Sequence, residues 1–427
     1  MENRYRVSKL KDSKNIVVQV PGSKSITNRA LMLAALGNGP CVLKGVLFSD
    51  DSRAFLSCLI ELGFLVEIRE DIKQVTILGT SGKIPHKSAS INVRSAGTAA
   101  RFLTVMLAVA GGDYVLESSE QMKKRPMEPL IVALRDAGVR VSCLEEEYHF
   151  PFRISSDGFH KEEVAINTDL SSQFASALLM AGILKAEGLT VILEGGRTNG
   201  SYLKVTMKVM EQFGIKVQRE GDICKVDRNF TYHMKEYNIE PDLSAAAYFY
   251  AIAPLCGKSV TVLGVHQDSM QGDIKFVKVL EQLGCDLLDT KDGLMVTKSD
   301  SYYNGIEINM KDFSDQTMTM AVLAAFAKSP SKITNVGHIR FQESNRIEAI
   351  VNELNRMGIQ ATATQEDIFI TPGSPKPTAI ETYEDHRMAM AFALVGLRAE
   401  GIEILNPQCC GKTFENYFEV LDELCVK

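Results

Sequence analysis

The chain has 427 residues, of which 45% are hydrophobic and 23% are charged, an ordinary balance for a globular protein. One hydrophobic core rarely serves a chain of this length, so two domains are expected. The formal net charge of −6 argues against nucleic acid as a partner, and any anion site must be a local group of cations.

The nine cysteines include no CxxC pair, and only Cys409 and Cys410 lie close together. This spacing favours neither a disulfide framework nor a zinc site, so we expect no metal. The N-terminal residues lack the apolar segment of a signal peptide, and no apolar run reaches membrane-spanning length. A reduced, cytoplasmic protein without a membrane partner is therefore expected.

Six segments start with a small polar residue and continue into a predicted helix rich in Ala, Leu and Met. They begin 72, 76, 73, 70 and 71 residues apart, which indicates an internal repeat. In chain order they are residues 23–31, 95–103, 171–178, 244–251, 314–321 and 385–391. Because apolar residues occur on almost every side of these predicted helices, we expect the helices to be buried.

A second, more amphipathic helix is predicted in each repeat. Five of these helices are followed by a glycine suited to a left-handed C-cap. The glycines are Gly63, Gly138, Gly214, Gly284 and Gly358, with Cys425 at the equivalent place in the last copy. Short strands such as 41–44, 114–117, 190–193, 260–263 and 402–405 lie between the helices. The pattern predicts an α/β protein of six βαβαββ-type units.

Six units divide naturally into two domains of three units each. The expected crossing points lie near Val20-Pro21 and near residues 239–242. The prediction is a discontinuous domain of residues 1–20 plus 240–427 and an inserted domain of residues 21–239. A repeat scaffold without any chemistry is the alternative, but the residues at the helix starts are too specialised for it.

Four of the predicted helix starts carry Lys or Arg. A helix N-terminus attracts phosphate and carboxylate groups, and a nearby cation strengthens that attraction. The stretches are PGSKSITNR from Pro21, RSAGTAAR from Arg94, KRP from Lys124 and DHR from Asp385. Each stretch alone could be an ordinary cap, but together, at equivalent places in a repeat, they indicate a shared site for polyanions.

Two short stretches look like the end of a nucleotide-binding P-loop, at Gly257-Lys-Ser and Gly411-Lys-Thr. A P-loop also needs a glycine five residues earlier, and those positions hold Ile252 and Asn406. A nucleotide kinase is therefore not expected.

Seven stretches, taken in order, resemble the family of 3-phosphoshikimate 1-carboxyvinyltransferases (EPSP synthases) over essentially the whole chain. They are PGSKSITNRALMLAAL from Pro21, AGTAARFL from Ala96, KRPMEPL from Lys124, DLSSQFASALL from Asp169, ESNRIEAI from Glu343, EDHRMAMAFAL from Glu384 and GKTFENYF from Gly411. The resemblance implies two inside-out α/β barrel domains that close on the substrates. It also implies transfer of the enolpyruvyl group of phosphoenolpyruvate to the 5-hydroxyl of shikimate 3-phosphate, in aromatic amino acid biosynthesis.

The resemblance also implies the binding residues. For phosphoenolpyruvate they are Lys24, Gly97, Arg125, Gln173, Arg346, Arg387 and Lys412. For shikimate 3-phosphate they are Lys24, Ser25, Arg29, Ser171, Ser172, Gln173, Asn199, Asp315 and Gln342. Arg offers a planar fork that suits both phosphate and carboxylate groups. No cofactor is expected, and a monomer is expected.

The reaction needs two acid/base groups on opposite sides of the reacting carbon atoms. We assign Asp315 to the acceptor hydroxyl, Glu343 to the methylene carbon, and Lys24 to proton transfer and phosphate departure, with His386 as a secondary candidate. The chain departs from the family pattern at Gln342, where Lys is common, and at Asn345, where an acidic residue is usual. Smaller departures occur at Phe102, Asn199 and His338.

Two rival functions remain at this point. An enolpyruvyl transferase acting on a UDP-sugar typically has a loop cysteine as general acid, and no Cys occurs between Gln121 and Met127. A non-catalytic anion-binding module would use the same cations without turnover. Release of phosphate distinguishes this module from an enzyme.

Overall fold

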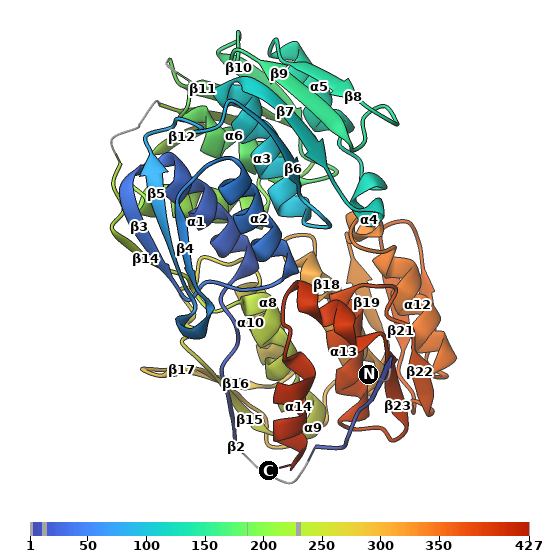
Figure 1. The fold of residues 1–427 in the computed structure, drawn as a ribbon. Helices are drawn as coiled ribbons and strands as arrows, with labels where there is room; N and C mark the ends of the chain where they lie inside the picture. The colour runs from blue at the N-terminus through green and yellow to red at the C-terminus, as the bar shows by residue number, and fades with distance from the viewer. Residues whose placement is uncertain (1–2, 11–14, 186, 228–231, 427) are drawn as a thin grey trace. The chain divides into compact units, whose positions relative to one another are not determined.

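The computed structural model of the protein describes residues 3–10, 15–185, 187–227 and 232–426. Residues 1–2, 11–14, 186, 228–231 and 427 belong to the predicted domain ranges but lie outside the described residues. The chain separates into two units (Figure 1). The terminal unit comprises Met1–Pro21 and Glu240–Lys427, and the central unit comprises Gly22–Ile239.

The described residues of the central unit form three four-stranded sheets with one shared topology. In each sheet the first two strands are parallel, and the third strand is antiparallel to both the second and the fourth. The sheets are β14 (Glu236–Asn238), β3 (Asn38–Lys44), β5 (Gln74–Thr80) and β4 (Val66–Arg69); β6 (Ser88–Asn92), β7 (Gly112–Glu117), β9 (Phe152–Ser156) and β8 (Arg140–Cys143); and β10 (Glu163–Asn167), β11 (Leu189–Glu194), β13 (Ile223–Val226) and β12 (Val217–Glu220).

The described residues of the terminal unit form two sheets of this topology and one three-stranded sheet in which β22 and β23 are parallel and β1 is antiparallel to β23. They are β2 (Asn15–Val18), β15 (Ser259–Leu263), β17 (Gly293–Thr297) and β16 (Asp286–Thr290); β18 (Glu307–Asn309), β19 (Ser331–Thr334), β21 (Ile368–Thr371) and β20 (Gln360–Ala363); and β22 (Thr378–Ile380), β23 (Ile402–Leu405) and β1 (Arg4–Arg6).

The helices of each unit are of two kinds, as the repeat predicts: buried helices and amphipathic ones. In the central unit they are α1 (Lys24–Leu36), α2 (Asp50–Glu61), α3 (Gly97–Ala110), α4 (Glu120–Lys123), α5 (Glu128–Asp136), α6 (Ser172–Gly182) and α7 (Ser201–Gln212). In the terminal unit they are α8 (Leu243–Tyr250), α9 (Ile252–Cys256), α10 (Ile274–Gln282), α11 (Thr317–Ala325), α12 (Arg346–Arg356), α13 (His386–Gly396) and α14 (Tyr417–Val426).

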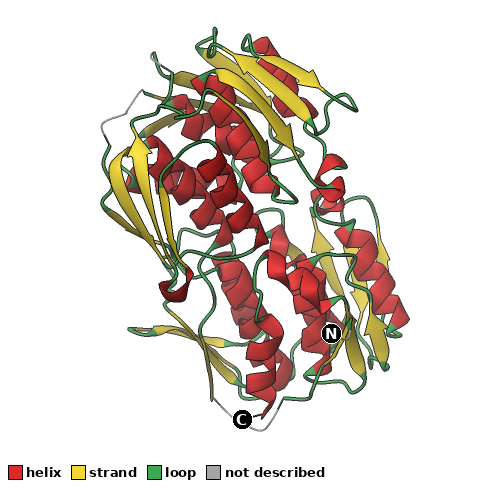
Figure 2. Cartoon of the chain, in the orientation of Figure 1, coloured by secondary structure: helices red, strands yellow, loops and turns green. Residues whose placement is uncertain are grey.

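Within each unit the buried helices lie inside and the sheets lie outside (Figure 2). Every residue of α11 and of α13 is buried, because small and apolar side chains occur on all sides of these helices. The strands alternate instead: in β10, Val164 and Ile166 are buried while Glu163 and Asn167 are exposed. The α/β architecture with internal helices that the sequence predicts is confirmed.

The glycines that follow the amphipathic helices adopt the left-handed conformation that the repeat predicts. Their φ angles lie between 81° and 95°, at Gly63, Gly138, Gly214, Gly284 and Gly358. A side chain is strained in this conformation, so glycine at these places ends each helix and turns the chain into the next strand.

The two segments where the chain passes between the units are each fixed in a sheet of their own unit. β2 pairs in parallel with β15, and β14 pairs in parallel with β3. Next to the first crossing, a Cβ atom at Gly22 would lie 1.8 Å from the Gly45 carbonyl oxygen, so only glycine fits there. Among the described helices, none combines the length and the apolar side chains that a bilayer crossing requires.

Candidate functional site

The residues that the sequence predicts for the site fall into two groups, one in each unit. The central unit holds Lys24, Ser25, Arg29, Gly97, Arg125, Ser171, Ser172, Gln173 and Asn199, and the terminal unit holds Asp315, Gln342, Glu343, Arg346, Arg387 and Lys412. Most of them lie in the first turn of a helix or in the turn just before it.

In the central unit, Lys24 is the first residue of α1, and its ammonium group faces a carboxylate. Its Nζ lies 3.4 Å from Oδ2 of Asp51, and the side chains are 15% and 4% exposed. Asp51 lies in the first turn of α2. An acidic residue at this place commonly stabilises the helix by interacting with the helix dipole, so it does not by itself indicate a site. Sequence reasoning therefore missed Asp51 as a neighbour of Lys24.

Arg29 is buried one helical turn beyond Ser25 in α1 and bonds α1 to α7. Its Nε donates to Thr206 Oγ1 at 2.7 Å, its Nη1 to the Ser25 carbonyl at 2.8 Å, and its Nη2 to the Tyr202 carbonyl at 3.1 Å. The guanidinium also lies 5.3 Å from the ring centroid of Phe102. Burial lowers the pKa of Arg29 to about 10, so the group keeps its charge at neutral pH.

The starts of α3 and α6 meet at the side-chain amide of Gln173. Its Oε1 accepts a hydrogen bond from Arg101 Nη1 at 2.7 Å, and its Nε2 donates to Thr98 Oγ1 at 3.2 Å. Ser171 caps α6 by accepting from the Gln173 backbone N–H at 3.2 Å. Both ends of the amide are therefore held in place. The sequence marks Arg101 as a cation near a helix start, but its contact with Gln173 follows only from the packing of α3 against α6.

Gly97 and Arg125, both predicted to bind phosphoenolpyruvate, lie against each other. A Cβ atom at Gly97 would lie 2.4 Å from Arg125 Nη1 and 3.0 Å from Arg101 Nη1. The missing side chain thus makes room for a guanidinium. Ser172 is partly buried as the first residue of α6. Asn199 lies exposed just before α7, and no contact with another predicted residue is described for it.

In the terminal unit, Arg346 starts α12 and lies at the centre of a buried ionic network. The side chain is 1% exposed. Its Nε lies 2.7 Å from Asp385 Oδ2, its Nη1 lies 3.1 Å from Asp315 Oδ1, and its Nη2 lies 2.8 Å from Glu343 Oε2. Nη1 also donates to Gln342 Oε1. Burial alone would lower the pKa of Arg346, but the three carboxylates raise it, so the group stays charged.

Arg387 completes the network from the first turn of α13. Its Nη2 donates to Asp315 Oδ2 at 2.8 Å, so Asp315 is held by two guanidinium groups. The backbone N–H of Arg387 donates to Asp385 Oδ1 at 2.9 Å, which caps α13. The network unites the predicted residues Asp315, Gln342, Glu343, Arg346 and Arg387 with Asp385. The sequence marks Asp385 as the first residue of the sixth repeat segment, but it does not reveal the contact with Arg346.

Three further residues lie near this network. His386 is 1% exposed, and its Nδ1 lies 3.9 Å from Asp385 Oδ1. His338, one of the departures from the family pattern, shares a 2.7 Å hydrogen bond with Ser314, the residue before Asp315. Burial and the charge of Asp315 raise the pKa of Asp273 to about 6, and no pattern in the sequence indicates a buried carboxylate there.

Lys412 ends the short 3₁₀ helix η4 (Pro407–Lys412) and is 8% exposed. Within the described ranges, its ammonium group has no hydrogen-bond or ion-pair partner. The Nε of Arg125 is likewise buried without a partner among the described residues. Burying an unpaired cation is unfavourable, so both groups are suited to an anionic ligand.

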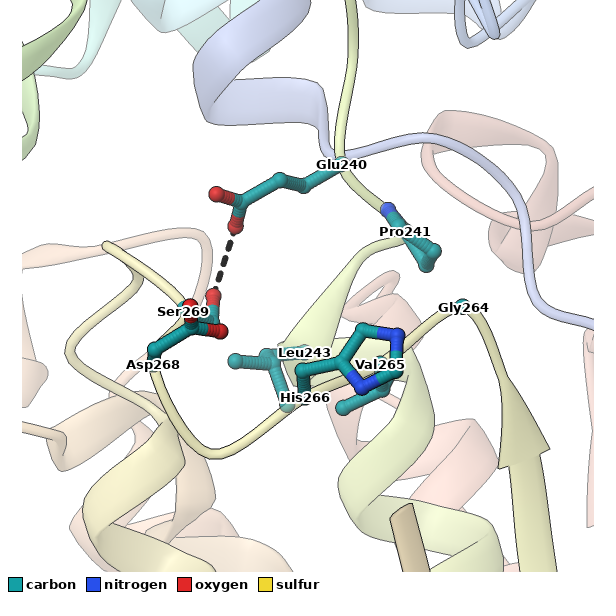
Figure 3. A pocket seen from close by; sticks show the side chains of 8 residues that line it. All are labelled: Glu240, Pro241, Leu243, Gly264, Val265, His266, Asp268 and Ser269. Carbon is teal, nitrogen blue, oxygen red and sulfur yellow. Dashed lines mark hydrogen bonds between the residues drawn. The ribbon is translucent and has the colours of Figure 1, made fainter. Parts of the chain in front are cut away.

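A small pocket of about 80 Å³ opens beside the start of α8 in the terminal unit (Figure 3). Its lining includes Glu240, His266 and Ser269, and none of the predicted site residues lines it. The Glu240 carboxylate accepts from Ser269 Oγ at 2.6 Å, and His266 Nδ1 lies 2.8 Å from Asp289 Oδ1. Among the described residues, no group of His, Cys, Asp or Glu could hold a metal ion.

Comparison with known proteins identifies relatives along nearly the whole chain. The family model of EPSP synthase (3-phosphoshikimate 1-carboxyvinyltransferase) matches residues 9–421. Proteins named 3-phosphoshikimate 1-carboxyvinyltransferase are similar: that of Nostoc punctiforme is 40% identical over 402 residues, covering 94% of each chain. That of Erwinia tasmaniensis is 38% identical over 411 residues, covering 95% of each chain.

A solved structure of EPSP synthase from Acinetobacter baumannii superposes with a TM-score of 0.83 at 24% identity, covering 99% of this chain and 98% of that one. At this level of identity the superposition establishes the fold, which agrees with the α/β architecture described above.

Proposed function

The chain belongs to the EPSP synthase (3-phosphoshikimate 1-carboxyvinyltransferase) family, and on that premise we propose how its own residues bind the substrates and carry the reaction. The enzyme moves the enolpyruvyl group of phosphoenolpyruvate to the 5-hydroxyl of shikimate 3-phosphate, in aromatic amino acid biosynthesis. The products are 5-enolpyruvylshikimate 3-phosphate and phosphate.

The observation that carries the residue assignment is Lys412, which is 8% exposed and whose ammonium group has no partner within the described ranges. A buried ammonium lowers the stability of the protein unless an anion compensates it. Phosphoenolpyruvate brings both a carboxylate and a phosphate. Its other proposed ligands are Lys24, Gly97, Arg125, Gln173, Arg346 and Arg387. Arg125, whose Nε also lacks a partner within the described ranges, supports the same assignment.

For shikimate 3-phosphate we propose the helix starts of α1 and α6, which offer hydroxyl groups, backbone N–H groups and a fixed cation. The proposed ligands are Lys24, Ser25, Arg29, Ser171, Ser172, Gln173, Asn199, Asp315 and Gln342. The charged guanidinium of Arg29, anchored beneath Ser25, supports binding of a phosphate there. Gln342 brings an amide instead of the lysine common in the family, so it contributes hydrogen bonds without charge.

In the addition step, Asp315 accepts the proton of the 5-hydroxyl as its oxygen forms a bond to C2 of phosphoenolpyruvate. Glu343, which must enter this step as the carboxylic acid, gives its proton to the methylene carbon, which becomes a methyl group, and a tetrahedral intermediate results. The two guanidinium groups that hold Asp315 aim this carboxylate, and Arg346 holds Glu343 in the same way. Both carboxylates are therefore fixed before the substrates arrive.

In the elimination step, the bond between C2 and the phosphate oxygen breaks and a methyl proton returns to Glu343, which restores the double bond. The departing phosphate takes up charge, and we propose that Lys24 stabilises it and supplies a proton. The partly buried contact of Lys24 with Asp51 holds the ammonium group in place for this purpose. His386, which is buried beside Asp385, is a secondary candidate for proton transfer.

The test is a phosphate-release assay with phosphoenolpyruvate and shikimate 3-phosphate, with shikimate and a UDP-sugar as control acceptors. We expect release only with shikimate 3-phosphate. Release with the UDP-sugar alone would establish the rival transferase, and substrate binding without release would establish an anion-binding module. An Asp315→Ala enzyme with near-normal turnover would refute the role of Asp315.

We further propose that the two units act as the two domains that close on the substrates, and that the enzyme works as a monomer in the cytosol. The nine cysteines support this compartment because all of them are free thiols.

A further inference from the structure

Asp273 lies immediately before α10, in the position where an acidic side chain usually caps a helix. It forms no side-chain cap. Instead, its carboxylate points to two other helix starts: Oδ1 accepts from Gln316 Nε2 at 3.0 Å, and Oδ2 accepts from Ser244 Oγ at 3.2 Å. Asp273 is only 6% exposed. Burying a carboxylate that has only two neutral hydrogen-bond donors destabilises the folded protein, which points to a role beyond packing.

Gln316 connects this carboxylate to the ionic network. It is the residue after Asp315, both lie in the 3₁₀ turn η2 (Ser314–Gln316), and it is fully buried. Its Nε2 is held by Asp273, and its Oε1 accepts from Thr319 Oγ1 at 3.3 Å. With both ends of the amide held, the turn that carries Asp315 has little freedom to rotate.

The loop that precedes Asp273 is held in place by hydrogen bonds to Glu240. The Glu240 carboxylate accepts from Ser269 Oγ at 2.6 Å (Figure 3) and from Gln271 Nε2 at 3.1 Å. Gln271 Oε1 in turn accepts from the Leu243 N–H at 3.2 Å, at the start of α8. Asp273 therefore has a fixed position relative to both α8 and η2.

The charges around Asp273 are Asp315, Arg387 and Asp242. Burial raises the pKa of Asp273 to about 6, and the negative charges of Asp315 and Asp242 act in the same direction. The charge of Arg387 and the hydrogen bond from Gln316 lower this pKa. Because the interaction is mutual, an ionised Asp273 also favours the protonated form of Asp315. The two arginines that hold Asp315 act in the opposite sense.

We propose that Asp273 is a positioning residue for Asp315: it holds the η2 turn through Gln316, and its negative charge makes Asp315 a stronger base than its two arginine partners alone would allow. The inference rests on the proposed role of Asp315 in taking the proton of the acceptor hydroxyl. Asp273 itself contacts neither substrate in this scheme.

The test compares three variants in the phosphate-release assay, with kcat and KM measured from mildly acidic to mildly basic pH. Asp273→Asn keeps an oxygen for Gln316 but removes the charge. Gln316→Leu keeps the charge of Asp273 but removes the hydrogen bond that joins Asp273 to the η2 turn. Glu353→Gln is the matched control, because Glu353 is also a fully buried carboxylate of this unit but is bonded to Arg356 and Tyr383.

In the wild type, kcat should rise with pH through about 6 as Asp273 ionises. Asp273→Asn should lose this rise and show a kcat about three- to tenfold lower at neutral pH, with both KM values within about twofold. In Gln316→Leu the rise should move to higher pH, because the bond from Gln316 lowers the pKa of Asp273. Glu353→Gln should retain the wild-type profile.

A profile of Asp273→Asn that superimposes on the wild type would overturn the inference. If that variant does not fold, a wild-type profile for Gln316→Leu would overturn it equally. A wild type that releases no phosphate would reject the proposed function and the inference together. An active wild type with an equally active Asp315→Asn enzyme would reject only the role of Asp315 and the inference that rests on it.

Discussion

Arg346 and Asp385 form an ion pair that is almost completely withdrawn from solvent: Nε lies 2.7 Å from Oδ2, and the side chains are 1% and 0% exposed. Asp385 also caps α13 and accepts from Ser344 Oγ at 3.0 Å. One carboxylate thus fixes the starts of α12 and α13, from which both arginines of the ionic network extend.

Replacing Asp385 by Ala should therefore destabilise the protein strongly. Removing one partner of a buried pair leaves the other incompletely compensated, which costs about 3–5 kcal/mol. Urea unfolding monitored by circular dichroism measures the loss. Lys9→Ala, which breaks the exposed pair with Glu400, is the control and should leave the unfolding midpoint unchanged. Equal midpoints for the two variants would contradict the structural role of Asp385.

Replacing Gly97 by Ala should weaken phosphoenolpyruvate binding while leaving the fold intact. The new methyl group would lie 2.4 Å from Arg125 Nη1, so the guanidinium must move. The clash is with the end of a flexible side chain, and the φ angle of Gly97 is not left-handed, so the backbone can stay in place. We expect a KM for phosphoenolpyruvate raised about tenfold and an unchanged melting temperature. An unchanged KM would show that Arg125 does not bind this substrate.

The repeat made much of the fold predictable from the sequence. Regular spacing placed the buried helices, and the glycines after the amphipathic helices placed their ends. The α/β architecture with internal helices followed from these two patterns and from the resemblance to a known family. Cations at the helix starts likewise drew attention to Lys24, Arg101, Arg125 and Arg387, because a helix start can be located by local pattern alone. Arg346 is predicted from the family resemblance alone.

The pairing of charges within the site could not be predicted in the same way. Asp315 and Arg387 are 72 positions apart, and which carboxylate meets which arginine depends on how the buried helices pack. Asp51 and Asp273 stand at helix starts, where local pattern assigns them to capping. Only the packed structure reveals that Asp51 faces Lys24, and that Asp273 accepts a hydrogen bond from Gln316 in place of capping its own helix.

Replacing Lys412 by Met should raise stability and lower activity at the same time. Lys412 is buried, and its ammonium group has no partner within the described ranges. An apolar side chain of similar length should therefore make the substrate-free protein more stable. The same change removes a charged contact with the substrate, and kcat/KM for phosphoenolpyruvate should fall about 10- to 100-fold. Thermal unfolding without substrates and steady-state kinetics measure the two effects. A lower melting temperature would show that Lys412 has a structural partner.

The stability of the protein should depend on pH through Asp273. Its pKa in the folded protein is raised to about 6 from an ordinary value of 3.8, so the folded state binds this proton more tightly than the unfolded state does. The stabilisation from that proton is complete below about pH 4 and is lost as the pH rises through about 6.

Asp273→Asn, which carries no charge at any pH, should therefore unfold at a higher denaturant concentration than the wild type at neutral pH. The two proteins should converge as the pH falls below about 4, because Asp273 is then neutral in both states. The comparison requires urea unfolding at a series of pH values, with Glu353→Gln as the second buried carboxylate. If Asp273→Asn is less stable than the wild type at neutral pH, the carboxylate is compensated in the folded protein, and the cost attributed here to its burial is wrong.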